Sequence, residues 1–99
     1  DCKSAQIKPS DLAPLISAFA NADGGTIVIG VSNTTRTLEG INFVGQDRIN
    51  DFISAPKDFC RPMPRYQKEF LDVVNVNGAA DRLLLLHIQE AVSYLHSFS

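Results

Sequence analysis

The chain has 99 residues, of which 44% are hydrophobic and 20% are charged, and its formal net charge is −2. This composition is typical of one small globular domain and excludes a disordered or fibrous chain. The longest apolar runs, 27-IVI-29 and 83-LLLL-86, are far shorter than the roughly 20 residues that cross a bilayer. A slightly negative chain has no general attraction for nucleic acid, so such binding needs a local basic surface. We expect one domain over residues 1–99, without a membrane partner.

The cysteines and the chain ends bear on cellular context. Cys2 and Cys60 have neither metal-site spacing nor the pattern of a disulfide framework, which favours reduced thiols and a cytoplasmic protein. The first residues lack the apolar segment of a signal peptide. Because the sequence begins at Asp1 and stops at 97-SFS-99, we expect it to be part of a longer chain.

The first third of the chain predicts a strand end followed by a helix. Residues 1–7 are short and mixed, and Pro9 marks a helix start. Gly24 and Gly25 end that helix, because glycine adopts the left-handed backbone conformation without a Cβ penalty. Apolar residues recur between these signals with helical spacing, which predicts a helix over 12–22: Leu12, Leu15, Ile16, Phe19 and Ala20.

The middle of the chain predicts a strand and a shorter helix. Residues 26–31 are almost all β-branched or apolar, which indicates a central strand buried on both faces. A polar turn covers 32–36, and 38–44 forms either a short strand or an extended connection that ends at Gly45. Apolar residues spaced i, i+3, i+4 predict a second helix over 46–54.

The last third predicts two paired strands. Prolines make 55–65 an irregular loop, and strands follow over 67–76 and 82–89, joined by a hairpin-type connection at 77-NGAAD-81. The second of these strands is apolar enough to be central. The tail 90–99 is either a helical turn or an extended arm. The order β-α-β-(β)-α-β-β predicts an α+β domain, with a small mixed sheet and about two packed helices.

The glycines around the first long strand do not form a phosphate site. A dinucleotide fingerprint needs a strand, then glycines, then a helix whose N-terminus faces the phosphate. Here the helix comes first, so its C-terminus, with partial negative charge, faces the Gly24-Gly25 turn. The P-loop pattern is absent as well. We assign Gly24 and Gly25 to the turn and Gly30 to close packing, and we expect no cofactor.

Carboxylates and histidines are scattered along the sequence. Metal-dependent nuclease chemistry needs two or three carboxylates at one point. Asp1, on the first strand, is the one weak catalytic candidate, because the residue at the exit of the 26–31 strand is the uncharged Asn33. His87 lies in an apolar strand and is interpreted as a core or cross-strand residue. We expect no metal site.

A local basic surface is predicted after the second helix. Cations and aromatic side chains alternate there: Lys57, Phe59, Arg61, Arg65, Tyr66 and Lys68. Lysine and arginine bind phosphates and aromatic rings stack on bases, so this set of side chains suits nucleic acid. The alternative is an ordinary proline-rich surface loop with solvated charges, and the sequence leaves both open.

Several blocks of the sequence resemble one known family. The blocks 1-DCK-3, 18-AFAN-21 with 24-GG-25, 30-GVSN-33 and 38-LEGI-41 resemble the AlbA-like domain of Schlafen proteins and of many bacterial regulators. In that family an acidic-aromatic-Lys strand is followed by a helix ending A-F-A-N before two glycines, and then by an apolar strand closing in G-V-x-D/N. The resemblance marks five residues as structural: Phe19, Asn21, Gly24, Gly25 and Gly30.

The resemblance implies an α+β fold and binding to DNA or RNA, within a bacterial transcriptional regulator. Lys3 would join the basic loop as a phosphate contact. In Schlafen nucleases the acidic set includes a first-strand Glu and an Asp after the second strand; Asp1 and Asn33 occupy these positions here, and the amide favours binding without catalysis. Two alternatives stay open: a metal-dependent RNA nuclease, and a protein-interaction or homo-oligomerisation module that uses an exposed strand or the 90–99 tail.

Overall fold

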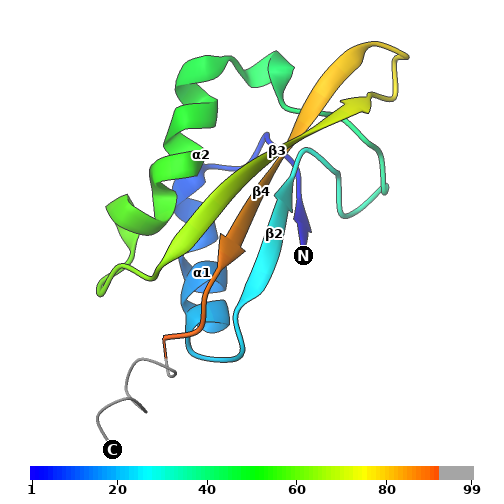
Figure 1. Ribbon diagram of the computed structural model, residues 1–99. Coiled ribbons are helices and arrows are strands. Elements are labelled where there is room, and N and C mark those ends of the chain that lie inside the picture. The colour runs from blue at the N-terminus through cyan, green and yellow to red at the C-terminus, as the bar shows by residue number, and fades with distance from the viewer. Residues whose placement is uncertain (92–99) are drawn as a thin grey trace, which may run out of the picture.

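The computed structural model describes residues 1–91 as two layers, a four-stranded sheet with two helices on one face (Figure 1). β1 and β2 are parallel, and the other neighbouring strands are antiparallel. The predicted α+β class with a small mixed sheet is therefore confirmed. In the sheet order β1-β2-β4-β3, the strands are β1 (Cys2–Lys3), β2 (Gly25–Ile29), β4 (Ala80–Ile88) and β3 (Tyr66–Val74).

The first helix begins as a 3-10 turn, η1 (Pro9–Leu12), and continues as α1 (Ala13–Ala20). A proline stands early in each piece, where the missing N–H costs least. α1 ends before the predicted position 22. Gly24 then donates its N–H to Phe19 O at 2.9 Å, which closes the turn and directs the chain into β2.

β2 lies between two strands, but it is not buried on both faces as predicted. Ile27 and Ile29 are fully buried under the helices, whereas Thr26 and Val28 on the opposite face are only half-buried. Both helices cover the same side of the sheet, so the other side meets solvent, as a sheet with antiparallel pairs allows. The apolar run is explained instead by cross-strand packing, with Leu85 directly opposite Val28.

Residues 38–44, predicted to form either a short strand or an extended connection, form the connection. Leu38 makes a single bridge with Val31, and a 3-10 turn, η2 (Asn42–Val44), follows. The N–H groups of Glu39 and Gly40 both donate to Gly30 O at 2.9 Å. This part of the chain therefore runs beside the end of β2 without forming a further strand.

α2 (Gln46–Phe59) is longer than predicted, because Pro56 lies inside the helix and not in the following loop. The predicted end at position 54 is wrong. Proline removes one helical hydrogen bond, but Pro56 is buried with Ile49, Phe52 and Ala55 on the face that packs against the core. Burial of that face stabilises the helix past the proline, and local sequence rules do not contain such tertiary packing.

β3 and β4 form a long hairpin whose ends differ by one or two residues from the predicted strands. β4 is central, between β2 and β3, as its apolar sequence predicts. The connection is closed by Asn75, whose side-chain oxygen accepts the N–H groups of Asn77 at 2.9 Å and Ala79 at 3.1 Å. The predicted tail lies outside the described residues from position 92 onward.

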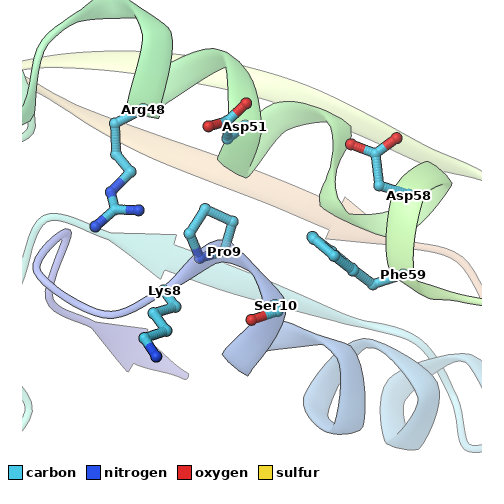
Figure 2. Close-up of a pocket in the computed structure, with 7 residues that line it drawn as sticks. All are labelled: Lys8, Pro9, Ser10, Arg48, Asp51, Asp58 and Phe59. Atoms are coloured by element: carbon cyan, nitrogen blue, oxygen red, sulfur yellow. The ribbon is translucent and has the colours of Figure 1, made fainter.

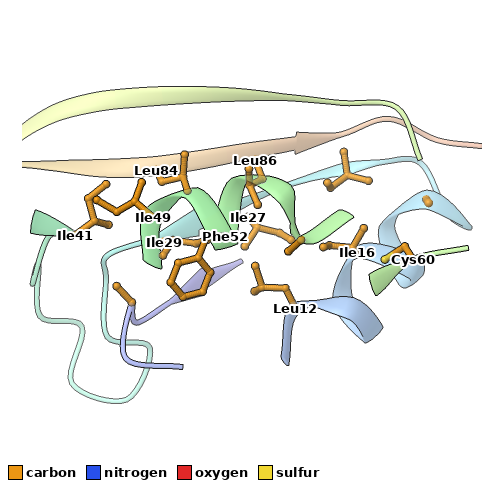
Figure 3. Packing of buried hydrophobic residues seen from close by; sticks show 14 residues of the cluster. Leu12, Ile16, Ile27, Ile29, Ile41, Ile49, Phe52, Cys60, Leu84 and Leu86 are labelled. Atoms are coloured by element: carbon orange, nitrogen blue, oxygen red, sulfur yellow. The ribbon is translucent and has the colours of Figure 1, made fainter. Parts of the chain in front are cut away.

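The core fills the space between the sheet and the helices (Figure 3). Cys60 is buried in it, Cys2 is half-buried on β1, and both are free thiols. No helix within residues 1–91 is long and apolar enough to span a bilayer. The fully buried apolar side chains come from both layers and include Leu12, Ile16, Ile27, Ile29, Ile41, Ile49, Phe52, Leu84 and Leu86.

Candidate nucleic-acid interface

The predicted basic residues lie where α2 ends and β3 begins, a point that Figure 1 shows as a short loop. Lys57 is in the last turn of α2, Arg61 follows the C-cap of that helix, and Arg65 precedes β3. Lys68 lies on β3, opposite Leu86 of β4. All four residues are exposed. We call these four cations the basic segment.

Among the described residues, no carboxylate lies within 4.0 Å of any cation of the basic segment. Arg61 is partly engaged, because Nη1 donates to Lys57 O at 2.6 Å and to Cys60 O at 2.8 Å. A guanidinium has five N–H donors, so Arg61 can cap the helix and still bind an anion. Lys57 and Arg61 also offset the negative end of the α2 dipole. The side chains of Arg65 and Lys68 make no hydrogen bond within residues 1–91, so all their donors are available to an anion.

Tyr66 is held in place beside the basic segment. Its ring packs against the core, and its hydroxyl donates to Ile53 O at 2.7 Å, which ties β3 to α2. Burial, with a smaller contribution from the nearby Asp58, raises the pKa of the Tyr66 hydroxyl, which therefore stays protonated at neutral pH. Stacking of a base on the accessible part of this half-buried ring stays a prediction.

Tyr66→Phe is expected to lower the free energy of unfolding by about 1 kcal/mol, the typical contribution of one hydrogen bond. The ring remains, so the change removes only the hydroxyl that reaches Ile53 O. Urea unfolding followed by circular dichroism measures the difference. An unchanged midpoint would show that this bond contributes nothing, and a loss above about 3 kcal/mol would indicate that the ring itself had moved.

Lys3 lies away from the other predicted phosphate contacts. It is on β1, and three strand spacings, or roughly 14 Å, separate β1 from β3 at the opposite edge of the sheet. Its ammonium is 4.0 Å from the carboxylate of Asp1, in a partly exposed ion pair. The structure therefore does not join Lys3 to the basic segment.

Asp1 and Asn33, the positions that the resemblance links to catalysis, differ in their place along β2. The backbone of Asp1 bonds to Thr26 and Val28, which sets Asp1 level with the middle of β2. Asn33 comes after the strand has ended, in an exposed turn. No group of three or more His, Cys, Asp or Glu side chains that could hold a metal ion occurs within residues 1–91.

A polar row crosses the open face of the sheet. His87 Nδ1 is 2.9 Å from Thr26 Oγ1, and His87 Nε2 is 2.8 Å from Glu69 Oε1. A neutral imidazole satisfies both contacts when Nε2–H donates to the carboxylate and Nδ1 accepts from the hydroxyl. His87 thus takes the cross-strand role, outside the core, and the row links β2, β4 and β3.

The glycine motif lies at crowded positions of the backbone. A Cβ on Gly25 would lie 2.9 Å from the ring of Phe19, and one on Gly30 would lie 2.7 Å from Leu83 Cδ2. Asn21 is the C-cap of α1, so the helix end with partial negative charge faces this turn. The motif therefore packs α1 against β2, and a phosphate would be repelled there.

Asp81 is the buried polar residue among residues 1–91, and the sequence did not single it out. Its Oδ1 accepts the N–H groups of Ile41 and Asn42 at 3.0 Å and of Arg82 at 2.7 Å, and its Oδ2 accepts from Asn75 Nδ2 at 3.0 Å. Burial is the largest single effect and would raise the pKa of this carboxyl, but the hydrogen bonds together lower it to about 2. No local pattern signals the site, because two of its donors lie about forty residues earlier in the chain.

A groove of about 440 Å³ lies between η1 and α2 (Figure 2). Figure 2 shows Lys8 and Arg48 toward one end, and Asp58 with Phe59 toward the other. The sequence did not single out Lys8 or Arg48, since only the packing of η1 against α2 brings them together. Carboxylates in the groove oppose a polyanion, so the basic segment remains the better candidate for an interface. The full lining is Lys8, Pro9, Ser10, Arg48, Asp51, Asp58 and Phe59.

The fold and its surface define a small α+β domain with one layer of helices and a local basic segment. A family model described as "Schlafen, AlbA_2" matches residues 1–97, and the chain belongs to this family. The resemblance of the sequence blocks is confirmed, and membership is consistent with a nucleic-acid-binding role. No curated protein matches the chain.

Proposed function

We propose that this chain is a non-catalytic nucleic-acid-binding module whose basic segment contacts phosphates. The observation that carries the proposal is the run of four exposed cations with no carboxylate of residues 1–91 within 4.0 Å, in a member of the Schlafen AlbA_2 family. Each cation that neutralises a phosphate releases counterions, so a local segment can bind a polyanion although the net charge of the chain is −2.

An aromatic ring next to these cations suits the binding of single-stranded nucleic acid. Tyr66 lies between Arg65 and Lys68, and its ring is already fixed by the core and by Ile53. A fixed ring loses little conformational entropy when a base stacks on it. Lys3, at the other edge of the sheet, would make a separate contact with a longer nucleic acid.

The family resemblance supports the finer parts of the proposal. The chain would serve in a larger bacterial transcriptional regulator in the cytoplasm, with DNA as the favoured partner and RNA as the alternative. Binding without cleavage is proposed because Asn33 supplies an amide where the nucleases of the family have a carboxylate.

Arg65→Ala is expected to weaken binding and to reduce the dependence of log K on log salt by about 0.9 for duplex DNA, or about 0.7 for a single strand. One phosphate contact is lost, and no hydrogen bond of the Arg65 side chain within the described residues is lost with it. Fluorescence anisotropy with labelled DNA and RNA of mixed sequence, titrated at several salt concentrations, measures the slope. Arg61→Ala/Arg65→Ala should lower it about twice as much.

The matched control is Arg36→Ala, which removes the same charge from an exposed turn away from the basic segment. The salt slope of Arg36→Ala should equal that of the unaltered chain. In a separate assay, labelled RNA incubated with the unaltered chain and Mg²⁺ should be recovered intact. Negligible binding of the unaltered chain at low salt would refute the proposal, as would equal slopes for Arg65→Ala and Arg36→Ala. Cleaved RNA would restore the nuclease alternative.

A further inference from the structure

β3 is an edge strand with one free side. It pairs with β4 along its whole length, and no described strand lies beyond it. Asn75 donates its N–H to Ala79 O at 2.8 Å, and Gln89 donates to Arg65 O at 3.0 Å, so odd-numbered residues of this segment turn their backbone groups toward β4. Because antiparallel pairs alternate, the even-numbered residues direct their N–H and C=O groups to the free side: Tyr66, Lys68, Phe70, Asp72 and Val74.

Little on this strand blocks a further strand. Within residues 1–91 no hydrogen bond uses the outward backbone groups of β3, and the strand contains neither a proline nor a break in its pairing with β4. Its side chains are also exposed and partly apolar, with Phe70 at 36%, Leu71 at 47% and Val74 at 66% exposure. A long, regular edge of this kind is a template for another chain.

The charges along β3 select one self-pairing. When β3 pairs antiparallel with β3 of a second copy about Phe70, Lys68 lies opposite Asp72 of that copy, and Asp72 lies opposite its Lys68. Pairings centred on Lys68, Glu69 or Asp72 instead place each of these charges against itself. A pairing centred on Leu71 makes no pair of opposite charges. Of the registers centred on residues 68–72, which overlap most of β3, only the one about Phe70 combines a free backbone edge with two attractive charge pairs.

We propose that two copies of this chain associate through β3, in the antiparallel register centred on Phe70, to join their four-stranded sheets into one. The outward groups of the even-numbered residues would form about ten backbone hydrogen bonds. Phe70 meets Phe70 of the second copy and Val74 meets Tyr66, so the exposed apolar side chains become covered.

The pairing has a consequence for nucleic acid that rests on the proposed function, although the dimer itself does not. A two-fold axis perpendicular to the joined sheet keeps both basic segments on the same face. Arg65 lies five residues from Phe70, so the two copies of Arg65 would be roughly 34 Å apart along the strands. One turn of duplex DNA has nearly this rise. Because Lys68 pairs with Asp72 in the dimer, each copy would present Lys57, Arg61 and Arg65 to phosphates, in step with a duplex.

A charge exchange across the axis tests the association without nucleic acid. Lys68→Asp and Asp72→Lys each replace two attractive pairs by two repulsive ones, and each is expected to weaken dimerisation of the 99-residue chain at least about tenfold. Lys68→Asp/Asp72→Lys restores both attractions and should return the dissociation constant to within about threefold of the unaltered chain. Sedimentation equilibrium over a wide concentration range measures the constants, and thermal unfolding of dilute samples checks that each variant is folded.

A cysteine cross-link tests the register. Phe70 is the one residue opposite itself, and Cα atoms of such a pair lie about 5.5 Å apart, within the range of a disulfide. In a Cys2→Ser background, Phe70→Cys should give a covalent dimer on mild oxidation, and the matched Val74→Cys, which faces Tyr66, should not. A chain that stays monomeric at all concentrations would overturn the proposal. So would a dimer that the exchanged charges leave unchanged, or one that Val74→Cys cross-links as well as Phe70→Cys.

Discussion

Gly24→Ala is expected to lower the free energy of unfolding by about 3 kcal/mol or more. Gly24 has φ +83°, a conformation that costs an L-residue roughly 1 kcal/mol. An added Cβ would also lie 2.6 Å from Ile88 O, so the end of β4 must move, and overpacking of this kind typically costs about 1–3 kcal/mol. The two costs add because one concerns the local backbone and the other a contact with a distant strand.

Gly78→Ala is the matched control for this prediction. Gly78 has φ +79°, close to that of Gly24, but a Cβ there meets nothing within 4 Å. Gly78→Ala should therefore lower the free energy of unfolding by the conformational cost alone, about 1 kcal/mol. Urea unfolding of both variants gives the difference, which isolates the contact with Ile88. Equal losses would show that the turn after α1 has room to relax, and the close packing of the glycine motif would then contribute little.

Asp81→Asn is expected to destabilise the domain by about 2 kcal/mol at neutral pH, the free energy that corresponds to lowering the pKa of this carboxyl from 3.8 to about 2. The amide keeps one oxygen for the N–H groups of Ile41 and Asn42. Its NH₂ group, however, would face the NH₂ group of Asn75. Asn75 cannot turn over, because its own oxygen already accepts two backbone N–H groups.

The pH dependence of this effect has a definite sign. The folded state lowers the pKa of Asp81, so its contribution is fully present above about pH 4 and is lost as the pH falls through about 2. The stability difference between the unaltered chain and Asp81→Asn should therefore shrink toward zero over that window. Unfolding measured at several pH values tests it, with the exposed Asp23→Asn as control. A difference that stays constant down to pH 2 would contradict the role assigned to the charge.

The residues changed in these two predictions, Gly24 and Asp81, both help to hold β4, which lies between β2 and β3 in the sheet. Gly24 packs against the end of β4, and Asp81 lies at its beginning, where it secures the connection before η2. β3 is held through its pairing with β4, through the Tyr66 ring packed against the core, and through the bond from the Tyr66 hydroxyl to α2. The position of the basic segment therefore depends on β4. Loss of nucleic-acid binding in these two variants would indicate a disturbed fold and not the loss of a phosphate contact.

Much of the fold could be predicted because its signals are local. The apolar stripe from Leu12 to Ala20 marks a helix, and the apolar run from Leu83 to Ile88 marks a central strand. The family could be predicted as well, since the A-F-A-N block and its two glycines are contiguous. The extent of α2 could not, because Pro56 reads locally as a helix end and only burial against the core overrides it.

The sequence by itself determined the class of fold, the order of its elements, the family and the composition of the basic segment, because each depends on residues near one another in the chain. The tertiary structure alone decided which faces are covered and which charges meet. It leaves one face of β2 open, places Lys3 at the far edge from Lys68, and gives Asp81 donors from distant segments. Among residues 1–91 it also leaves β3 without a neighbouring strand on one side. These properties arise from packing between segments far apart in sequence, which no local pattern encodes.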